Sequence, residues 1–97
     1  MIELYTWSTP NGQKASIMLE EVGLPYRVHP IDIGKDHQFH PDFLAIAPNN
    51  KIPAIVDIDN GLRLMESGAI LLYLADKAGM LWPQDFPTKW RVVEWLM

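Results

Sequence analysis

A proline-led hairpin constrains the fold of this 97-residue chain more than any other segment. Pro53 opens a β-rich run over residues 54–58, and a proline is tolerated in a strand only at its first position or at a sheet edge. Asp59-Asn60-Gly61 then forms a strong turn signal, which predicts that the chain returns as a second short strand over residues 62–65. The segment therefore indicates two antiparallel strands.

The two open ends of this hairpin are expected to lie side by side. Ile52-Pro53 precedes the first strand, and Glu66-Ser67 follows the second, directly before an apolar helical run. Ser67 is a candidate N-cap for that helix, which is expected over residues 67–77 and to stop at Gly79. A peptide-like ligand could then meet the free backbone of Ile52 and the helix N-terminus together.

The N-terminal third predicts a right-handed βαβ unit. An alternating strand over residues 2–7 leads into a helix with Thr9 as N-cap and Pro10 at its first position. Gly23 stops the helix, and a strand over residues 26–31 follows, parallel to the first because a helix connects them. The apolar face of the helix is expected to consist of Ala15, Met18, Leu19 and Val22.

Together these segments predict an α/β fold with the order β-α-β-β-β-α, a mixed four-stranded sheet and helices on both faces, as in thioredoxin. Residues 32–50 are irregular and polar, with one or two helical turns over 41–46. Residues 69–75 are apolar all round the helix, so something else is expected to cover its outer side. After a linker with Pro83 and Pro87, Thr88 is expected to begin an amphipathic helix that has no stop signal.

Charge and composition exclude several classes of function. The net charge is −4 without a basic stripe, so nucleic acid is not expected as a partner, and no apolar run approaches the ~20 residues that span a membrane. The chain contains no cysteine, which is compatible with a cytoplasmic location. Any thiol chemistry must therefore use a sulfur atom of the ligand.

The loop that ends the first strand is a candidate site for such a sulfur. Free N–H groups and the positive dipole end at a helix N-terminus stabilise an anion such as a thiolate. The Thr9 hydroxyl and the Asn11 amide could both donate to it, although both residues are also ordinary in an N-cap and a turn. Tyr5 and Ser8 are rival hydroxyls.

Over its whole length the chain resembles the glutathione-binding, thioredoxin-like domain of the glutathione transferases, and its Ser8–Gly12 loop is most similar to the bacterial nu class. The resemblance implies a cis Ile52-Pro53 bond whose Ile52 backbone pairs with the cysteinyl part of glutathione. It implies that Thr9 and Asn11 contact the thiol and act as catalytic residues. It further implies the remaining glutathione-binding residues: Gln38, Lys51, Pro53, Glu66 and Ser67, with the last two at the γ-glutamyl end.

The resemblance also implies the activity and the domain organisation. Glutathione is the expected co-substrate, and the second substrate is a small electrophile or a disulfide. We expect a glutathione-dependent transferase or disulfide-bond oxidoreductase; the alternative is a non-catalytic binding or regulatory module, because this fold also serves as a scaffold. Residues 1–80 form the glutathione-binding domain, 81–87 a linker and 88–97 the start of a truncated, all-helical second domain. A homodimer is expected, since the apolar helix surfaces need cover.

Two other groups of residues carry weaker signals. His37 and His40 with Asp36 and Asp42 could be drawn as a metal site, but Pro41 interrupts the spacing and no third motif follows, so no metal is expected. The four tryptophans, Trp7, Trp82, Trp90 and Trp95, are expected in the core or between domains. Neither the electrophile nor the choice between disulfide reduction and conjugation follows from the sequence.

Overall fold

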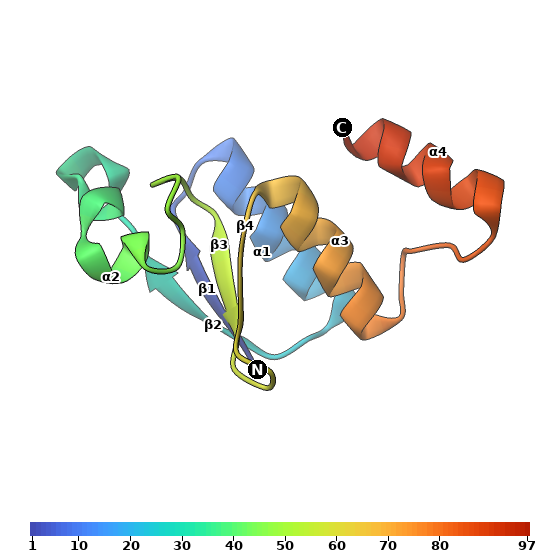
Figure 1. The fold of residues 1–97 in the computed structure, drawn as a ribbon, viewed down its shortest axis with the longest axis horizontal. Helices are drawn as coiled ribbons and strands as arrows, with labels where there is room; N and C mark the ends of the chain where they lie inside the picture. The colour runs from blue at the N-terminus through green and yellow to red at the C-terminus, as the bar shows by residue number, and fades with distance from the viewer.

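The computed structural model describes all residues, 1–97, and its centre is a mixed four-stranded sheet in the order β2-β1-β3-β4 (Figure 1). Strand β1 (Ile2–Thr6) is parallel to β2 (Tyr26–Pro30) and antiparallel to β3 (Ala54–Asp57). Strand β4 (Leu62–Met65) completes the hairpin with β3, with Ala54 opposite Met65. The predicted thioredoxin-like order and the mixed sheet are confirmed.

Helices cover both faces of this sheet (Figure 1). Helices α1 (Pro10–Val22) and α3 (Ser67–Ala78) pack together on one face over a core of buried aliphatic side chains: Ile2, Leu4, Ala15, Leu19, Ile55, Ile70 and Leu74. On the other face, the short helix α2 (Pro41–Leu44) brings Phe43 and Ala47 against Ala54. Strands β1, β3 and β4 contribute alternate residues to the two cores, as the two-residue period of a strand requires.

Helix α1 begins and ends where the sequence predicts. The Thr9 side chain accepts a hydrogen bond from the Gly12 N–H at 3.0 Å, and Pro10 occupies the first turn. Gly23 ends the helix with a φ of 72°, a left-handed conformation that glycine adopts without the steric cost of a side chain. Three of the four predicted apolar positions, Ala15, Leu19 and Val22, are buried, and Met18 is half-buried.

The predicted cap of α3 is wrong. Ser67 is the first helical residue, and Glu66 is the N-cap, with a φ of 74° and no hydrogen bond from its side chain to the helix. The left-handed φ lets the chain turn from the end of β4 directly into the helix, so no residue remains between them to act as a serine cap. The predicted stop at Gly79 is confirmed.

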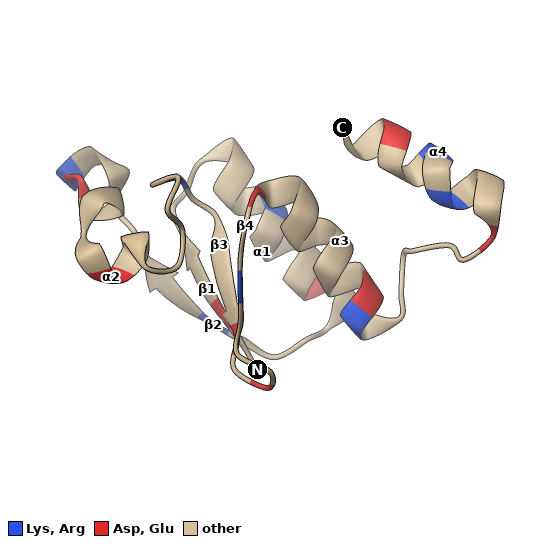
Figure 2. Cartoon of the chain, in the orientation of Figure 1, with Lys and Arg blue, Asp and Glu red and all other residues tan.

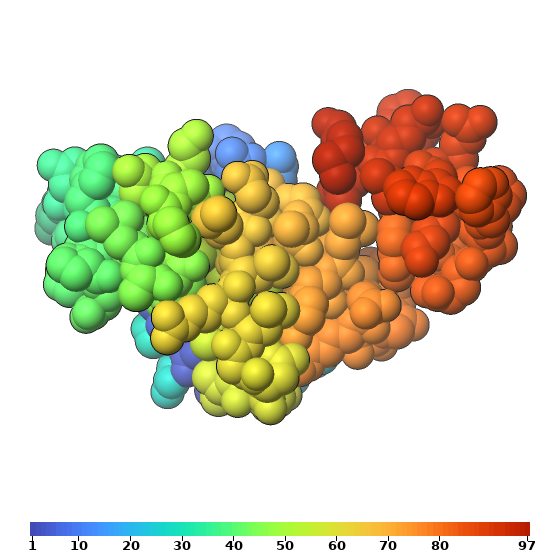
Figure 3. Space-filling view, viewed as in Figure 1, coloured from blue at the N-terminus to red at the C-terminus, as the bar shows by residue number.

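The last helix begins earlier than predicted. Helix α4 spans Phe86–Leu96 rather than starting at Thr88, because the Asp85 carboxylate accepts the Thr88 N–H at 3.3 Å and so caps the helix. No residue of α4 is buried, and the helix stands apart from the sheet (Figures 1 and 3). Trp90 and Trp95 are 58% and 87% exposed, and Trp7 and Trp82 are half-buried, so no tryptophan lies in the core.

The segment between β2 and β3 is mostly irregular, as predicted. Two single 3-10 turns, Ile33–Lys35 and His37–Phe39, precede α2, which is shorter than the predicted range of 41–46. Lysine and arginine residues are distributed over several elements and interspersed with acidic residues (Figure 2). None of the helices has both the length and the apolar character needed to cross a membrane.

Candidate functional site

Two adjoining cavities lie where the first turn of α1, the start of β3 and the start of α3 meet. The larger, of about 470 Å³, is lined by Thr9, Asn11, Ile33, Gln38, Asn50, Lys51 and Ile52. The smaller, of about 170 Å³, is lined by Asn11, Asn49, Lys51, Ile52, Pro53, Glu66 and Ser67. All eight residues predicted for the site therefore line these two cavities, which share Asn11, Lys51 and Ile52, although the eight come from four separate parts of the sequence.

Thr9 can cap α1 and still serve a ligand. Its hydroxyl oxygen accepts the Gly12 N–H, and this bond uses a lone pair of the oxygen rather than its proton. The O–H remains able to donate to an acceptor in the larger cavity. The two interpretations of Thr9 drawn from the sequence are thus compatible, because the helix and the ligand use different parts of the hydroxyl.

Lys14 fixes the orientation of the Asn11 side-chain amide. Its Nζ atom donates to Asn11 Oδ1 at 2.9 Å, one turn along the surface of α1. An ammonium only donates, so the amide oxygen must face it and the amide NH₂ is left for other partners. Asn11 lines both cavities, and its free N–H groups suit an anion such as a thiolate. Lys14 was not predicted, since a lysine at this spacing is common on exposed helices.

The peptide bond between Ile52 and Pro53 is cis, as the resemblance implied. Ile52 precedes β3, and neither its N–H nor its C=O takes part in a backbone hydrogen bond. The strand-like edge it presents can pair with an extended ligand. The Asn49 side-chain oxygen accepts the Lys51 N–H at 3.2 Å and thereby orders the approach to this edge.

The start of α3 offers groups for both charges of an amino-acid end. Its first turn has no side-chain cap, so its free N–H groups and positive dipole end can bind a carboxylate. Glu66 is exposed beside it, and its Oε1 accepts from Asn49 Nδ2 at 3.3 Å. The carboxylate of Glu66 could bind an ammonium group. Asn49, which was not predicted as a site residue, thus contacts both sides of the smaller cavity.

One residue that lines the larger cavity, Gln38, carries an unpaired polar atom. Its Oε1 atom is buried and has no hydrogen-bond partner, although Gln38 lines that cavity. Buried polar atoms in folded proteins are nearly always paired, so this oxygen is expected to accept a hydrogen bond from a water molecule or from a ligand group that reaches it. Lys51 is exposed and lines both cavities, which places a positive charge within reach of an anionic ligand.

The rival hydroxyls lie elsewhere. Tyr5 lines neither cavity; its ring stacks on His29 at 4.5 Å and packs beside Phe43, on the sheet face that α2 covers. Burial, together with the nearby Glu3 carboxylate, raises the pKa of Tyr5 above its ordinary value. Ser8 is exposed and also lines neither cavity. No group of three or more His, Cys, Asp or Glu side chains is arranged to hold a metal ion.

Comparison with known proteins adds three findings. The sequence model of the family described as "Glutathione S-transferase, N-terminal domain" matches residues 9–77. The disulfide-bond oxidoreductase YfcG of Escherichia coli K12 is 52% identical over 101 residues, which cover 99% of this chain and 47% of YfcG. The chain thus spans about half the length of this curated relative.

Solved structures agree with this similarity. A glutathione transferase family member from Pseudomonas fluorescens, with two glutathione molecules bound, superposes with a TM-score of 0.94 at 51% identity. A glutathione transferase from Pseudomonas putida, with one glutathione disulfide bound per subunit, superposes with a TM-score of 0.93 at 50% identity. In both comparisons 99% of this chain and 44% of the other are covered.

Proposed function

Because this chain belongs to the glutathione S-transferase family, whose N-terminal domain it contains, we propose that it binds glutathione across the two adjoining cavities and activates its thiol. The observation that carries the proposal is the convergence of donors and acceptors in these two cavities: Thr9, Asn11, Gln38, Lys51, Ile52, Pro53, Glu66 and Ser67. The γ-glutamyl carboxylate meets the first turn of α3, and the cysteinyl backbone pairs with Ile52. The thiol then lies near Thr9 and Asn11.

Hydrogen bonds at that position suffice to ionise the thiol. An ordinary thiol has a pKa of about 8.5, and a hydrogen bond to a charged group is worth roughly 1.5–3 kcal/mol. One pKa unit equals about 1.4 kcal/mol, so one such bond lowers the pKa by about one to two units. The Thr9 hydroxyl, the Asn11 amide and the dipole of α1 together make the thiolate the main species at neutral pH.

The proposed reaction is the reduction of disulfides through glutathione, with conjugation to electrophiles as a second activity. The glutathione thiolate attacks one sulfur of a substrate disulfide, forming a mixed disulfide and releasing the other sulfur as a thiolate, which takes up a proton. A second glutathione thiolate then releases the first substrate sulfur and leaves glutathione disulfide. The name of the relative YfcG and the disulfide bound in the P. putida structure support this choice.

Thiol ionisation gives the direct test of this function. We expect Thr9→Ala and Asn11→Ala to raise the pKa of bound glutathione, each by up to about one to two units, because a lost donor disfavours the charged form. Tyr5→Phe and Ser8→Ala should change it little, since neither residue lines the cavities. The ultraviolet absorbance of bound thiolate, followed against pH, measures the value.

The same titration separates the alternative, a non-catalytic binding or regulatory module, from an enzyme. Such a module would bind glutathione without lowering the pKa of its thiol. A large shift in Tyr5→Phe, with none in Thr9→Ala and Asn11→Ala, would assign the activation to a tyrosine and contradict the proposal.

Anchoring of the γ-glutamyl end gives a second prediction. Ser67→Ala removes a hydroxyl donor from the carboxylate, which should cost about 1.5–3 kcal/mol, or roughly ten- to a hundredfold in affinity for glutathione. Thr88→Ala is the matched control, because Thr88 is an exposed hydroxyl residue in the first turn of α4. Calorimetric titration should show no change for the control; equal losses in both variants would mean that Ser67 acts only through folding.

The proposal extends to the domain division and the oligomeric state of the protein. We propose that residues 1–80 form the glutathione-binding unit and that α4 belongs to a separate, helical unit after a linker. The lack of any buried residue in α4 supports this division. We also propose a homodimer, supported by the exposed Phe86 and Trp95 on α4. The cytoplasmic location expected from the cysteine-free sequence stays a prediction.

A further inference from the structure

A third cavity lies on the sheet face that α2 covers, and none of its lining residues is among those assigned to glutathione. It has a volume of about 320 Å³, and its apolar lining comes from Tyr5, Ile31, Phe43 and Ile46. Phe43 is only 2% exposed, and its ring lies 6.3 Å from that of Tyr5 at an angle of 48°. The volume is at the lower end of the range for small-molecule sites, so the cavity has room for a molecule of about ten heavy atoms, which would remain partly exposed to solvent.

Two histidines at this cavity have a defined tautomer. His37 Nδ1 accepts the Asp32 N–H, and His40 Nδ1 accepts the Asp42 N–H, both at 3.2 Å. A neutral imidazole that accepts at Nδ1 carries its proton on Nε2, which is then a donor. Neither Nε2–H is used in a hydrogen bond within the chain, and neither is the Tyr5 hydroxyl. The cavity therefore combines an aromatic wall with up to three unused donors.

The charges around the cavity favour a neutral ligand. Behind the Tyr5 ring, the carboxylate of Glu3 pairs with the Arg27 guanidinium and also contacts His29, so the positive charge of Arg27 already has a partner. Asp42 also lines the cavity, and its carboxylate oxygen lies 3.8 Å from His40 Nδ1. A second carboxylate beside Asp42 would be repelled only weakly, because the Asp42 side chain is 95% exposed to water. The unused donors call for an acceptor, and a neutral carbonyl oxygen provides one without this repulsion.

We propose that this cavity is a second ligand site, which binds a small, flat aromatic molecule bearing a neutral carbonyl group. The aromatic part lies against Tyr5 and Phe43, where ring contacts add about 0.5–1.5 kcal/mol beyond area burial. The carbonyl oxygen accepts from the histidine Nε2–H groups or the Tyr5 hydroxyl. The glutathione cavities share no lining residue with this one, so both sites can be occupied together.

The test uses acetophenone as the probe and ethylbenzene as its matched control, which has a similar shape but no carbonyl. Amide chemical shifts of the intact protein are followed during titration, in the absence and presence of saturating glutathione. We expect acetophenone to shift the signals of residues 37–46 and of Tyr5, with an affinity that glutathione leaves unchanged. Ethylbenzene should bind several-fold more weakly, and benzoate should bind slightly more weakly because of the charge of Asp42.

Variants locate the probe. Tyr5→Phe keeps the aromatic ring and removes only the hydroxyl donor, so it should weaken acetophenone binding by about two- to tenfold if Tyr5 donates to the carbonyl. Ile46→Trp should block the cavity, whereas Ile58→Trp, at a residue that is 53% exposed and outside it, should not. Equal binding of acetophenone and ethylbenzene, displacement by glutathione, or full binding to Ile46→Trp would each overturn the proposal.

Discussion

Gly12→Ala is expected to destabilise the protein by about 2–3 kcal/mol or more and to weaken glutathione binding with it. A Cβ atom on Gly12 would lie 2.2 Å from the Trp7 carbonyl oxygen and 2.5 Å from Thr6 Oγ1. The nearer atom belongs to the backbone, so it cannot move aside by rotating a side chain. The start of α1 must instead shift away from the end of β1, and the Thr9 cap shifts with it. Denaturant unfolding and calorimetric titration with glutathione measure the two effects.

Gly68→Ala is the matched control for this prediction. Gly68 also lies in the first turn of a helix, but the nearest atom to its added Cβ would be Met97 Cε at 3.9 Å, an ordinary contact. Alanine is favoured over glycine inside helices, so Gly68→Ala should be neutral or stabilising by up to about 1 kcal/mol. Similar losses in both variants would show that the approach of α1 to Trp7 is not what requires Gly12.

Local chemistry in the sequence predicted most of the fold. The start of α1 at Pro10, the helix ends at Gly23 and Gly79, and the turn over 59–61 all depend on backbone conformations that these residues favour. These boundaries could therefore be predicted without knowledge of the tertiary structure. Strand ends were less predictable, because they depend on pairing. Strand β1 was predicted to reach Trp7 but stops at Thr6, whose partner Pro30 is the last residue of β2.

The candidate site was predictable mainly through resemblance rather than through physical signals in the residues. A serine that follows a strand and precedes an apolar run is ordinarily predicted to be an N-cap. Nothing in the sequence indicated that Glu66 would adopt a positive φ and take the N-cap position instead of Ser67. Asn49 and Lys14 were missed because each acts by orienting another side chain, Glu66 or Asn11, and an isolated polar residue does not reveal its partner. Contacts between residues far apart in the chain require the fold.

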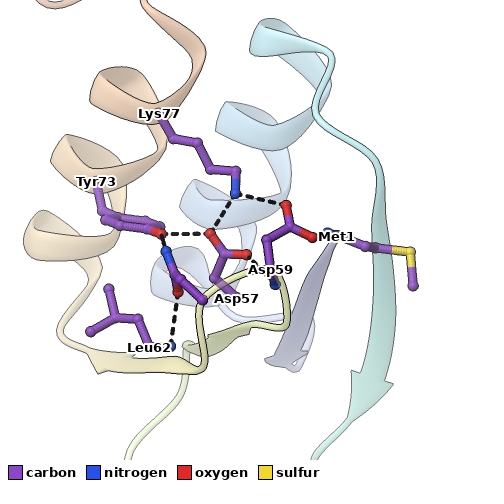
Figure 4. Close-up of polar contacts among 7 residues, drawn as sticks. Met1, Asp57, Asp59, Leu62, Tyr73 and Lys77 are labelled. Carbon is purple, nitrogen blue, oxygen red and sulfur yellow. Dashed lines mark hydrogen bonds and ion pairs between the residues drawn. The ribbon is translucent and has the colours of Figure 1, made fainter.

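A polar network around Asp57 is the clearest example of a feature that only the fold reveals (Figure 4). Asp57 is fully buried at the end of β3, and its Oδ2 atom accepts from the Tyr73 hydroxyl at 2.5 Å and from Lys77 Nζ at 2.6 Å. Its Oδ1 atom accepts the Asp59 N–H at 3.0 Å. The network thus fastens the hairpin turn to the last two turns of α3.

Asp57→Ala is expected to lower the free energy of unfolding by about 3 kcal/mol. Removing one partner of a buried ion pair typically costs 3–5 kcal/mol, and the lower end applies because Lys77 retains Asp59 at 3.0 Å. Asp59→Ala is the control: its carboxylate is 58% exposed and should be worth no more than about 1 kcal/mol. Unfolding in denaturant at neutral pH measures both; equal small losses would mean that the buried carboxylate is not an anchor of the fold.

The pH dependence of the Asp57 contribution identifies its charge as the cause. Burial alone would raise the pKa of Asp57, but the hydrogen bonds from Lys77, Tyr73 and the Asp59 N–H outweigh it, and the pKa lies below the ordinary value of 3.8. A carboxyl group with a lowered pKa stabilises the folded state above its unfolded-state pKa, and that contribution is lost as the pH falls through the folded-state value. The stability difference between the wild type and Asp57→Asn should therefore be constant near neutrality and shrink below about pH 4. Asparagine keeps the size of the side chain, so a difference that persisted unchanged into acid would assign the loss to packing rather than to the carboxylate.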